Sequence, residues 1–476
     1  MAAEELCFLP ATELAPMIRR KRVSPKELTA AVLARIAALN PRINAFANLT
    51  AGQAIAAAEA AEAKLFADAP LGPLHGVPVT LKDLTYTKGI ATESGSRLRQ
   101  NFVPEQDAPM VTRLKEAGAI VLGKTTTSEF GWTGVSRSPL TGITHNPWRH
   151  GSNAGASSAG AAAAAAAGFG PLHQGSDGAG SIRMPAHFCG VFGLKPTFGR
   201  VPNWPLSNTD YTSHNGPLTR TVADAALMLK VMAGPHPWDH TSCESPPLDY
   251  SARLAGGIAG KRVAFSADLG HARVDPNVAE LVRGAVRAFD DFGATVEEVT
   301  PGWGPQGPEL IRFFWPAHLA VHGPALPEWQ ERMDPGLVAC IRAGERTGIV
   351  EYQKMRERKY AYCMAIHRFF ENWDFLLTPA VSVAAFPAER LQPAHWPEHD
   401  WDWVSWAEFS YPFNFSGNPA ASVPCGFTRD GLPVGLQIVG RRFDDLAVLQ
   451  AAAAFERARP WADKRPALPA QPAAAS

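Results

Sequence analysis

The segment that most constrains the fold of this chain runs from residue 151 to residue 197. It is rich in glycine and alanine, and polar residues such as Ser157, Ser181 and Lys195 interrupt it. Neither a flexible Gly/Ser linker nor a plain alanine helix has this composition. Glycine allows backbone N–H groups to come close to a partner, and small side chains leave room for that partner. The segment therefore predicts a nucleophile beside backbone N–H groups that can stabilise an anion.

The bulk composition limits the class of protein. The chain has 476 residues, of which 46% are apolar and 19% charged, so a large core can form and disorder is disfavoured. Lysine and arginine together number 45, as do aspartate and glutamate. Nucleic acids and anionic membranes bind surfaces with a basic excess, which this chain lacks. We therefore expect a small-molecule substrate and neither of those two partners.

The cysteines and the N-terminus predict a cytoplasmic protein. The six cysteines are scattered, without a C-x-x-C motif or a cysteine–histidine cluster, so neither a disulfide framework nor a zinc site is predicted. The first ten residues include two acids and lack the pattern of a signal peptide. No uninterrupted apolar run reaches the ~18 residues that a membrane span requires. We expect no metal and no cofactor, and both a monomer and a homodimer remain open.

Helix and strand patterns alternate along most of the chain. The predicted helices cover residues 25–40, 51–66, 109–118, 158–167, 222–232, 275–292, 352–370 and 446–457. The predicted strands cover residues 77–81, 119–122, 261–265, 295–299, 375–378, 420–424 and 436–439. This alternation predicts an α/β fold with a mixed sheet and helices on both of its faces.

The chain is predicted to form one large domain over residues 1–476. Its expected parts are a helical N-terminal part (1–70), a core around the Gly/Ala/Ser segment (71–235), a C-terminal part that shapes the substrate site (236–464) and a frayed tail (465–476). Residues 303–335 are predicted to be irregular. The loop at 386–406 contains three prolines and four tryptophans, which predicts either a lid or a surface loop whose tryptophans pack inward.

Residues 118–125 match the phosphate-loop pattern G-x-x-x-x-G-K-[ST] letter for letter. That motif requires a strand, then a flexible loop and then a helix. Here the four loop positions are Ala-Ile-Val-Leu, which favour a strand, and the predicted helix precedes them. A nucleotide-binding protein is therefore the less favoured alternative.

Several kinds of hydrolytic site can be excluded by motif. The chain has no G-x-S-x-G nucleophile elbow and no S-x-x-K motif. What remains is a set of serines in small-residue backbone and a lysine from another part of the chain. Lys82 follows the predicted strand 77–81, at the strand end where sites of open α/β sheets lie, although by itself it is more simply a surface lysine.

Together these motifs resemble the amidase signature family, in particular its amidases and urethanases. The resemblance is carried by residues 76–83 (GVPVTLKD), 123–130 (GKTTTSEF), 146–148 (NPW), 155–160 (GASSAG), 175–186 (GSDGAGSIRMPA), 193–197 (GLKPT) and 412–437. It covers most of the chain, and its motifs are long and specific. It implies a single α/β domain around a large twisted mixed sheet.

The resemblance implies a Ser–cis-Ser–Lys triad. Ser181 corresponds to the nucleophile, Ser157 to the bridging serine and Lys82 to the base. The oxyanion hole would be formed by the backbone of Gly178, Ala179, Gly180 and Ser181. Three further residues would support the site: Ser158, Asp177 and Arg183. Separately from the resemblance, candidate pocket residues come from segments 126–132 and 200–211 and from the loop at 396–406, with Phe130, Gly131, Trp132, Arg200 and Tyr211 as named candidates.

The chain departs from the family pattern at three alanines, Ala156, Ala159 and Ala179, where glycine is common. Each added methyl disfavours a positive φ but removes no N–H group. The implied reaction is hydrolysis of an amide or carbamate C–N bond through an acyl-enzyme on Ser181. It requires a neutral lysine, whose pKa must fall from its usual value of ~10.4. A glutamyl-tRNA amidotransferase A subunit, which shares the signature, is the other enzyme that the resemblance allows.

Overall fold

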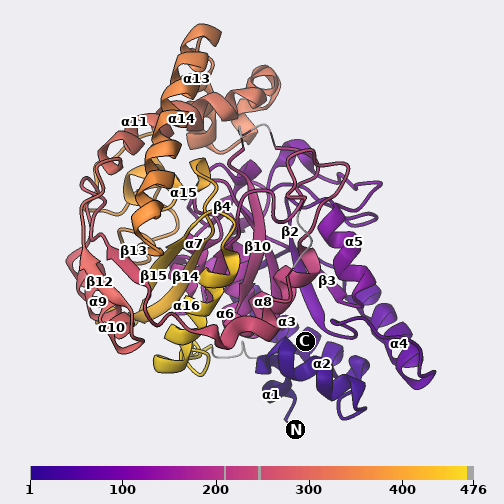
Figure 1. The fold of residues 1–476 in the computed structure, drawn as a ribbon. Coiled ribbons are helices and arrows are strands. Elements are labelled where there is room, and N and C mark those ends of the chain that lie inside the picture. The colour runs from indigo at the N-terminus through magenta and orange to yellow at the C-terminus, as the bar shows by residue number, and fades with distance from the viewer. Residues whose placement is uncertain (1, 208, 210, 245–247, 469–476) are drawn as a thin grey trace.

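An eleven-stranded sheet forms the centre of the protein (Figure 1). The structure is a computed structural model that describes residues 2–207, 209, 211–244 and 248–468. Within this part of the chain, the strands of the large sheet lie in the order β1 (Phe46–Leu49), β3 (Ile120–Thr125), β2 (Pro78–Lys82), β8 (Leu172–Asp177), β10 (His214–Thr219), β9 (Phe192–Lys195), β14 (Ala420–Phe427), β15 (Pro433–Gly440), β13 (Phe375–Pro379), β11 (Arg262–Phe265) and β12 (Thr295–Glu298). Two small sheets pair β4 (Arg137–Ser138) with β5 (Gly142–Ile143) and β6 (His145–Asn146) with β7 (Arg149–Asn153).

Helices from all parts of the described chain surround the sheet. The α-helices are α1 (Ala3–Phe8), α2 (Ala11–Arg19), α3 (Pro25–Ile43), α4 (Ala51–Phe66), α5 (Pro109–Glu116), α6 (Ala159–Ala167), α7 (Arg183–Cys189), α8 (Val222–Met232), α9 (Pro276–Val286), α10 (Ala288–Asp291), α11 (Gly307–Leu319), α12 (Leu326–Trp329), α13 (Pro335–Gly344), α14 (Ile349–Asn372), α15 (Pro412–Phe415) and α16 (Asp445–Ala458). Short 3₁₀ helices are η1 (Arg97–Arg99), η2 (Glu129–Gly131), η3 (Ser251–Gly256), η4 (Gly304–Gln306), η5 (Ala320–Ala325), η6 (Gln330–Arg332) and η7 (Trp403–Trp406).

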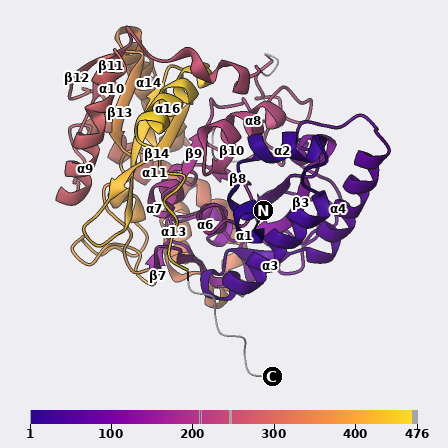
Figure 2. The ribbon, with the colours of Figure 1, turned by 90° about the horizontal axis from the view of Figure 1, so that it is seen from below.

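Strand directions make the sheet mixed. Strand β2 is parallel to β3 and β8, and β11 is parallel to β12 and β13, whereas the other neighbours are antiparallel. Helices α8 and α16 lie on one face and α6 and α7 on the other (Figure 2). Every residue of α6 is buried, which its small alanine side chains allow. The predicted α/β fold, with one mixed sheet flanked by helices, is confirmed.

Most of the predicted elements are present, with shifted ends. The helices predicted over 51–66 and 222–232 coincide with α4 and α8, and the strand predicted over 119–122 is the start of β3. Ser24 caps α3 by accepting hydrogen bonds from the N–H groups of Lys26 and Glu27. The predicted end of this helix at residue 40 is wrong. The helix continues to the buried Ile43 and ends at Asn44, which takes a left-handed conformation.

The prediction that residues 303–335 are irregular is wrong. Helix α11 lies within this segment and buries Leu310, Ile311, Phe314 and Trp315 at helical spacing. Pro308 stands in its first turn, where the missing N–H group costs nothing. The density of glycine and proline in the segment concealed this 3.6-residue period in the sequence.

The tryptophans of the 386–406 loop pack inward, which was one of the two predicted arrangements. Trp396, Trp403 and Trp406 are buried in one aromatic cluster with Trp132 and Trp315. In the predicted tail, Pro466 is buried and Leu468 packs against the core, while residues 469–476 lie outside the described residues. Among the described helices, none combines the length and apolarity needed to cross a membrane.

Candidate active site

Three parallel strands bring their carboxyl ends together at the candidate site. Strand β2 lies between β3 and β8, so Lys82, Thr125 and the end of β8 at Asp177 reach the same edge of the sheet. Sites of α/β sheets lie at this edge because the following loops converge there. Residues 118–125, which resemble a phosphate loop, instead contribute the buried strand β3, and Lys124 donates hydrogen bonds to Thr85 O and Thr87 Oγ1. The prediction of a strand at this motif is confirmed.

Lys82 is completely buried and hydrogen-bonded to serines. Its Nζ atom lies 2.7 Å from Ser157 Oγ, 3.0 Å from Ser176 Oγ and 3.3 Å from Ser176 O. Burial lowers the pKa of Lys82 from 10.5 to about 7, and the carboxylate of Asp177 opposes this shift in part. A substantial share of the amine is therefore neutral at neutral pH. A neutral amine can accept a proton from the Ser157 hydroxyl along this same contact.

Ser157 is positioned by two close backbone segments. It follows a cis peptide bond after Ala156. On the cavity side, Gly131 approaches so closely that an added Cβ would lie 3.1 Å from Ser157 Oγ. Phe130 and Gly131 both have a positive φ, of 50° and 75°, which turns the chain toward the serine. The next residue, Ser158, joins the two halves of the Gly/Ala/Ser segment, because its N–H donates to Ser181 O and its hydroxyl to Ser176 O.

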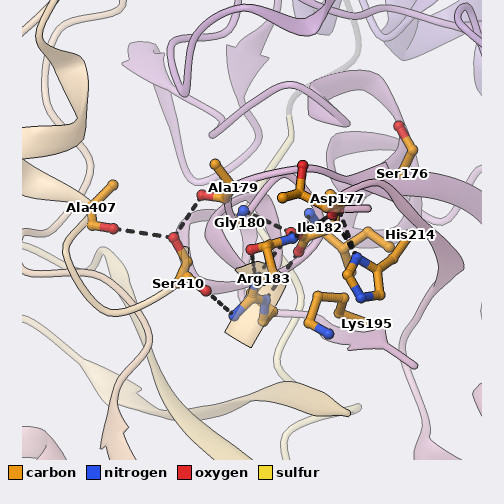
Figure 3. Close-up of polar contacts among 12 residues, drawn as sticks. Ser176, Asp177, Ala179, Gly180, Ile182, Arg183, Lys195, His214, Ala407 and Ser410 are labelled. Carbon is orange, nitrogen blue, oxygen red and sulfur yellow. Dashed lines mark hydrogen bonds and ion pairs between the residues drawn. The ribbon is translucent and has the colours of Figure 1, made fainter. Parts of the chain in front are cut away.

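A buried ion pair holds the loop that carries Ser181 (Figure 3). The Asp177 carboxylate accepts hydrogen bonds from the N–H groups of Gly180 at 2.7 Å and Ile182 at 3.1 Å. Arg183 completes the pair with Nη2 at 2.9 Å from Asp177 Oδ1. Burial opposes ionisation, but the Arg183 guanidinium and further hydrogen bonds keep the pKa of the Asp177 carboxyl below its usual value. The loop is thus tied to one carboxylate on both sides of Ser181.

Residues from the distant C-terminal part complete this support, and the sequence analysis did not identify them. Arg183 donates to Ser410 O, Gln437 Oε1 and Asn414 Oδ1. The Ser410 hydroxyl donates to Ala179 O at 2.7 Å. The buried Lys195 and His214 lie beside them, as Figure 3 shows. Of the three C-terminal residues Ser410, Asn414 and Gln437, only Asn414 and Gln437 fall in segments that carry the family resemblance, and no short motif connects them to Asp177.

The four residues of the expected oxyanion hole differ in their hydrogen bonds. Gly180 gives its N–H to Asp177. Among the hydrogen bonds of the described residues, none uses the N–H of Gly178, Ala179 or Ser181. Of these three residues, Gly178 and Ser181 line the cavity beside the serines. Gly180 has φ +116°, and a Cβ there would lie 2.4 Å from Ser410 Oγ, so only glycine fits.

A cavity of about 310 Å³ opens beside the serines and is called the Ser181 cavity below. Gly131, Ser157, Ser176, Gly178 and Ser181 line it, together with residues from several other segments. Trp204 lies in the segment 200–211 that was expected to contribute to the pocket. The sequence analysis missed the others: Tyr86, Arg99, Trp315, His318 and His322. They come from loops and helices with no common motif, so no local pattern marks them.

Two of the five predicted pocket residues line the Ser181 cavity, and the other three do not. Phe130 and Gly131 line the Ser181 cavity. Trp132 is buried behind it, where its carbonyl accepts a hydrogen bond from Trp315 Nε1. Arg200 points away and pairs with Asp445 at 3.0 Å, and Tyr211 lines an adjacent cavity of about 370 Å³. In the described part of the chain, no three His, Cys, Asp or Glu side chains are grouped to hold a metal ion.

Comparisons with known proteins identify the family of this chain. The family model for amidases matches residues 27–449. An acylamidase from Rhodococcus erythropolis is 40% identical, with 98% of this chain and 99% of that protein covered. The A subunit of a glutamyl-tRNA(Gln) amidotransferase from Moorella thermoacetica is 35% identical over 98% of this chain and 99% of its own length.

Similarity to solved structures indicates the same family. The structure of a bacterial aryl acylamidase of the amidase signature family superposes with a TM-score of 0.89 at 29% identity, covering 95% of this chain and 97% of its own. The structural similarity and a family match over residues 27–449 lead to one assignment. The chain belongs to the amidase signature family and is an enzyme that hydrolyses amide C–N bonds.

Proposed function

We propose that this enzyme hydrolyses amides through an acyl-enzyme on Ser181, with Ser157 and Lys82 as the proton relay. The observation that carries the proposal is the 2.7 Å contact between Lys82 Nζ and Ser157 Oγ, made by a lysine whose pKa burial lowers to about 7. A serine hydroxyl is a weak nucleophile and needs an adjacent base. A buried neutral amine supplies that base, and Ser157 faces the same cavity as Ser181.

The first half of the reaction forms an ester. Ser181 Oγ attacks the carbonyl carbon, its proton moves to Ser157 Oγ, and the Ser157 proton moves to Lys82 Nζ. The N–H groups of Ala179 and Ser181 stabilise the oxyanion that develops; loss of one such donor typically raises the barrier by about 3 kcal/mol. The C–N bond then breaks while the relay returns the proton to the leaving nitrogen.

The second half releases the acid. Water attacks the acyl ester on Ser181, the relay accepts the water proton, and the same proton returns to Ser181 Oγ as the ester breaks. A carbamate would follow the same course, with an alkoxycarbonyl group on the serine. Asp177 and Arg183 act as positioning residues in this scheme, because they hold the backbone on both sides of the nucleophile.

The substrates that we propose are small amides with an aryl or other apolar group, and the corresponding carbamates. The aromatic walls of the Ser181 cavity, among them Tyr86, Phe130 and Trp315, support a flat or apolar group. The relatives named acylamidase and aryl acylamidase support the same class. Support for an amidotransferase A subunit comes from the 35% identity to such a protein. Glutaminase activity that appears only with partner subunits would favour that role.

The test is hydrolysis by the purified chain alone. A panel of nitroanilides, short aliphatic amides and aryl carbamates is ranked by kcat/KM. We expect at least one aryl amide to be cleaved, and Ser181→Ala to abolish turnover with an unchanged circular dichroism spectrum. Mass spectrometry of the wild-type enzyme quenched during turnover should find the acyl group on the peptide that contains Ser181. A Ser181→Ala enzyme that still hydrolyses any accepted amide would refute the proposal.

A further inference from the structure

The Ser181 cavity contains one charged side chain that the proposed mechanism does not use. Among the described residues, Arg99 is the only Asp, Glu, Lys or Arg that lines it. The remaining walls are apolar, aromatic or neutral polar groups. A cation in such surroundings attracts an anionic partner strongly, because little water screens the interaction.

Aromatic side chains hold the Arg99 guanidinium in one orientation. Arg99 ends the short helix η1, and its guanidinium carbon lies 4.2 Å from the ring centroid of Phe102 and 5.5 Å from that of Tyr86. Its Nη2 donates a 2.6 Å hydrogen bond to the hydroxyl of Tyr86. A guanidinium that is stacked in this way loses less freedom when it binds a ligand. The group is therefore preorganised at the cavity wall.

Arg99 has no carboxylate partner among the described residues. Three other partly or fully buried arginines do have one: Arg183 pairs with Asp177 at 2.9 Å, Arg200 with Asp445 at 3.0 Å and Arg312 with Asp402 at 2.6 Å. The buried Arg220 instead uses its donors on backbone carbonyls. Of the five N–H groups on the Arg99 guanidinium, one is donated to Tyr86. The others can reach the paired oxygens of a planar anion.

The charge of Arg99 affects His322, which lines the same cavity as the serines. The ring of His322 stacks on Phe130 with centroids 4.2 Å apart, and Phe130 precedes the Gly131 that approaches Ser157. Burial, together with the charge of Arg99, lowers the pKa of His322 to about 4. His322 is thus neutral at pH 7, and Arg99 supplies the positive charge of this wall.

We propose that Arg99 binds a carboxylate of the substrate, so that the preferred amides carry a carboxylate away from the bond that is cleaved. This inference rests on the proposed amidohydrolase function and adds a substrate class to it. The guanidinium would donate two parallel hydrogen bonds to the carboxylate while the scissile carbonyl lies at Ser181. A neutral substrate of equal size would leave those donors without an acceptor.

The test compares pairs of substrates that differ in one group. One member is the 4-nitroanilide half-acid of a linear dicarboxylic acid, the other has a primary amide in place of the carboxylate, and several chain lengths are used. A second series carries the same pair of groups on the amine side. We expect wild-type kcat/KM to favour the acid roughly 10- to 100-fold in at least one pair. In Arg99→Met this ratio should fall to about one, with the neutral member still hydrolysed.

Matched variants make the result decisive. Arg97→Met removes the exposed arginine two residues earlier, whose side chain donates to Pro139 O, and should keep the preference for the acid. Arg99→Lys, which keeps the charge without the paired donors, should keep part of it, and it replaces the methionine variant if that does not fold. An acid-to-amide ratio within twofold of one in every wild-type pair overturns the proposal, as does a preference that survives in Arg99→Met.

A binding measurement separates this inference from the proposed reaction. Calorimetry with Ser181→Ala and with Ser181→Ala/Arg99→Met compares the half-acid and the primary amide without turnover. If the wild-type enzyme hydrolyses no nitroanilide, the proposed reaction fails for this class. Tighter binding of the acid that is lost with Arg99 still supports the inference. Equal binding of acid and amide to Ser181→Ala refutes it.

Discussion

At the scale of single residues, the burial of Lys82 determines the pH range in which its amine is neutral. Its Nζ has serine partners, and burial lowers its pKa to about 7. A protonated amine cannot take the Ser157 proton, whereas a neutral amine can. In the proposed mechanism, the three-dimensional surroundings of this lysine therefore set the pH range in which the relay works.

The pH profile should report this group. We expect kcat/KM for an uncharged amide to fall about tenfold for each pH unit below the Lys82 pKa of about 7, and to level off above it. The measurement covers pH 5 to 9 with a substrate that does not titrate. A profile that stays flat from pH 5 to 8 would rule out Lys82 as the base with this pKa.

Substitutions of Lys82 should separate charge from basicity. Lys82→Met removes the base and should lower kcat by about 10²- to 10⁴-fold. Lys82→Arg keeps a cation but offers no neutral form near pH 7, so it should be equally slow.

The lowered pKa of Lys82 also affects stability. Its pKa in the folded state lies below its pKa in the unfolded state, so the unfolded state binds more protons between about pH 7 and 10.5. In this range, Lys82 therefore makes the protein more stable as the pH rises. Urea unfolding at pH 7 and pH 9.5 should show a smaller rise in stability for Lys82→Met than for the wild type.

At the scale of elements, the loop between β8 and α7 depends on a contact from the other half of the chain. Ser410 donates to Ala179 O and packs against Gly180 where no Cβ fits. The loop is therefore held by the ion pair of Asp177 and Arg183 and by Ser410, which lies close to α15 in the sequence. Its conformation needs glycine at one position for two reasons, the positive φ and the missing space.

Gly180→Ala should consequently destabilise the protein by roughly 2–4 kcal/mol, from backbone strain and overpacking. The matched variant is Gly178→Ala, whose Cβ would meet its nearest atom, Ser213 Oγ, at 3.8 Å. It should change the unfolding free energy by less than about 1 kcal/mol. Both values come from urea unfolding followed by circular dichroism. Equal destabilisation by the two alanines would show that the Ser410 contact is not the cause.

At the scale of the whole molecule, one sheet joins the N-terminal and C-terminal parts. Strand β9 pairs with β14, and Asp445 at the start of α16 accepts hydrogen bonds from Thr197 N and Arg200 Nε. Arg200 therefore connects the end of the Gly/Ala/Ser segment to the last helix. The structure gives it this connecting position and does not place it on the Ser181 cavity.

Arg200→Met should lower the free energy of unfolding by about 2–4 kcal/mol, because the buried Asp445 loses its charged partner. Arg262→Met is the control: its pair with Glu297 is exposed and 3.7 Å long, so its loss should cost less than about 1 kcal/mol. Thermal and urea unfolding measure both. If Arg200 touched the substrate, its loss would change the relative kcat/KM of a large and a small amide; we expect the two to change in parallel.

The fold class could be predicted from the sequence, and the structure confirms it; the roles of Ser181, Ser157 and Lys82 stay predictions. The α/β alternation and the strand at residues 118–125 follow from local patterns that the structure confirms. Helix α11 was missed because glycine and proline concealed its period, and β8 was missed because its sequence LHQGSD contains no β-branched residue. In both cases tertiary packing overrides weak local preference.

What the sequence alone determined is the set of groups that need a special backbone. Ser157, Ser181 and the glycines around them form recognisable motifs because the required conformation restricts each position to small residues. Only the tertiary structure decided how far Lys82 lies from Ser157, which arginine pairs with Asp445 and which one, Arg99, faces the cavity. Burial and charge pairing depend on segments that are distant in the chain, so no local pattern contains them.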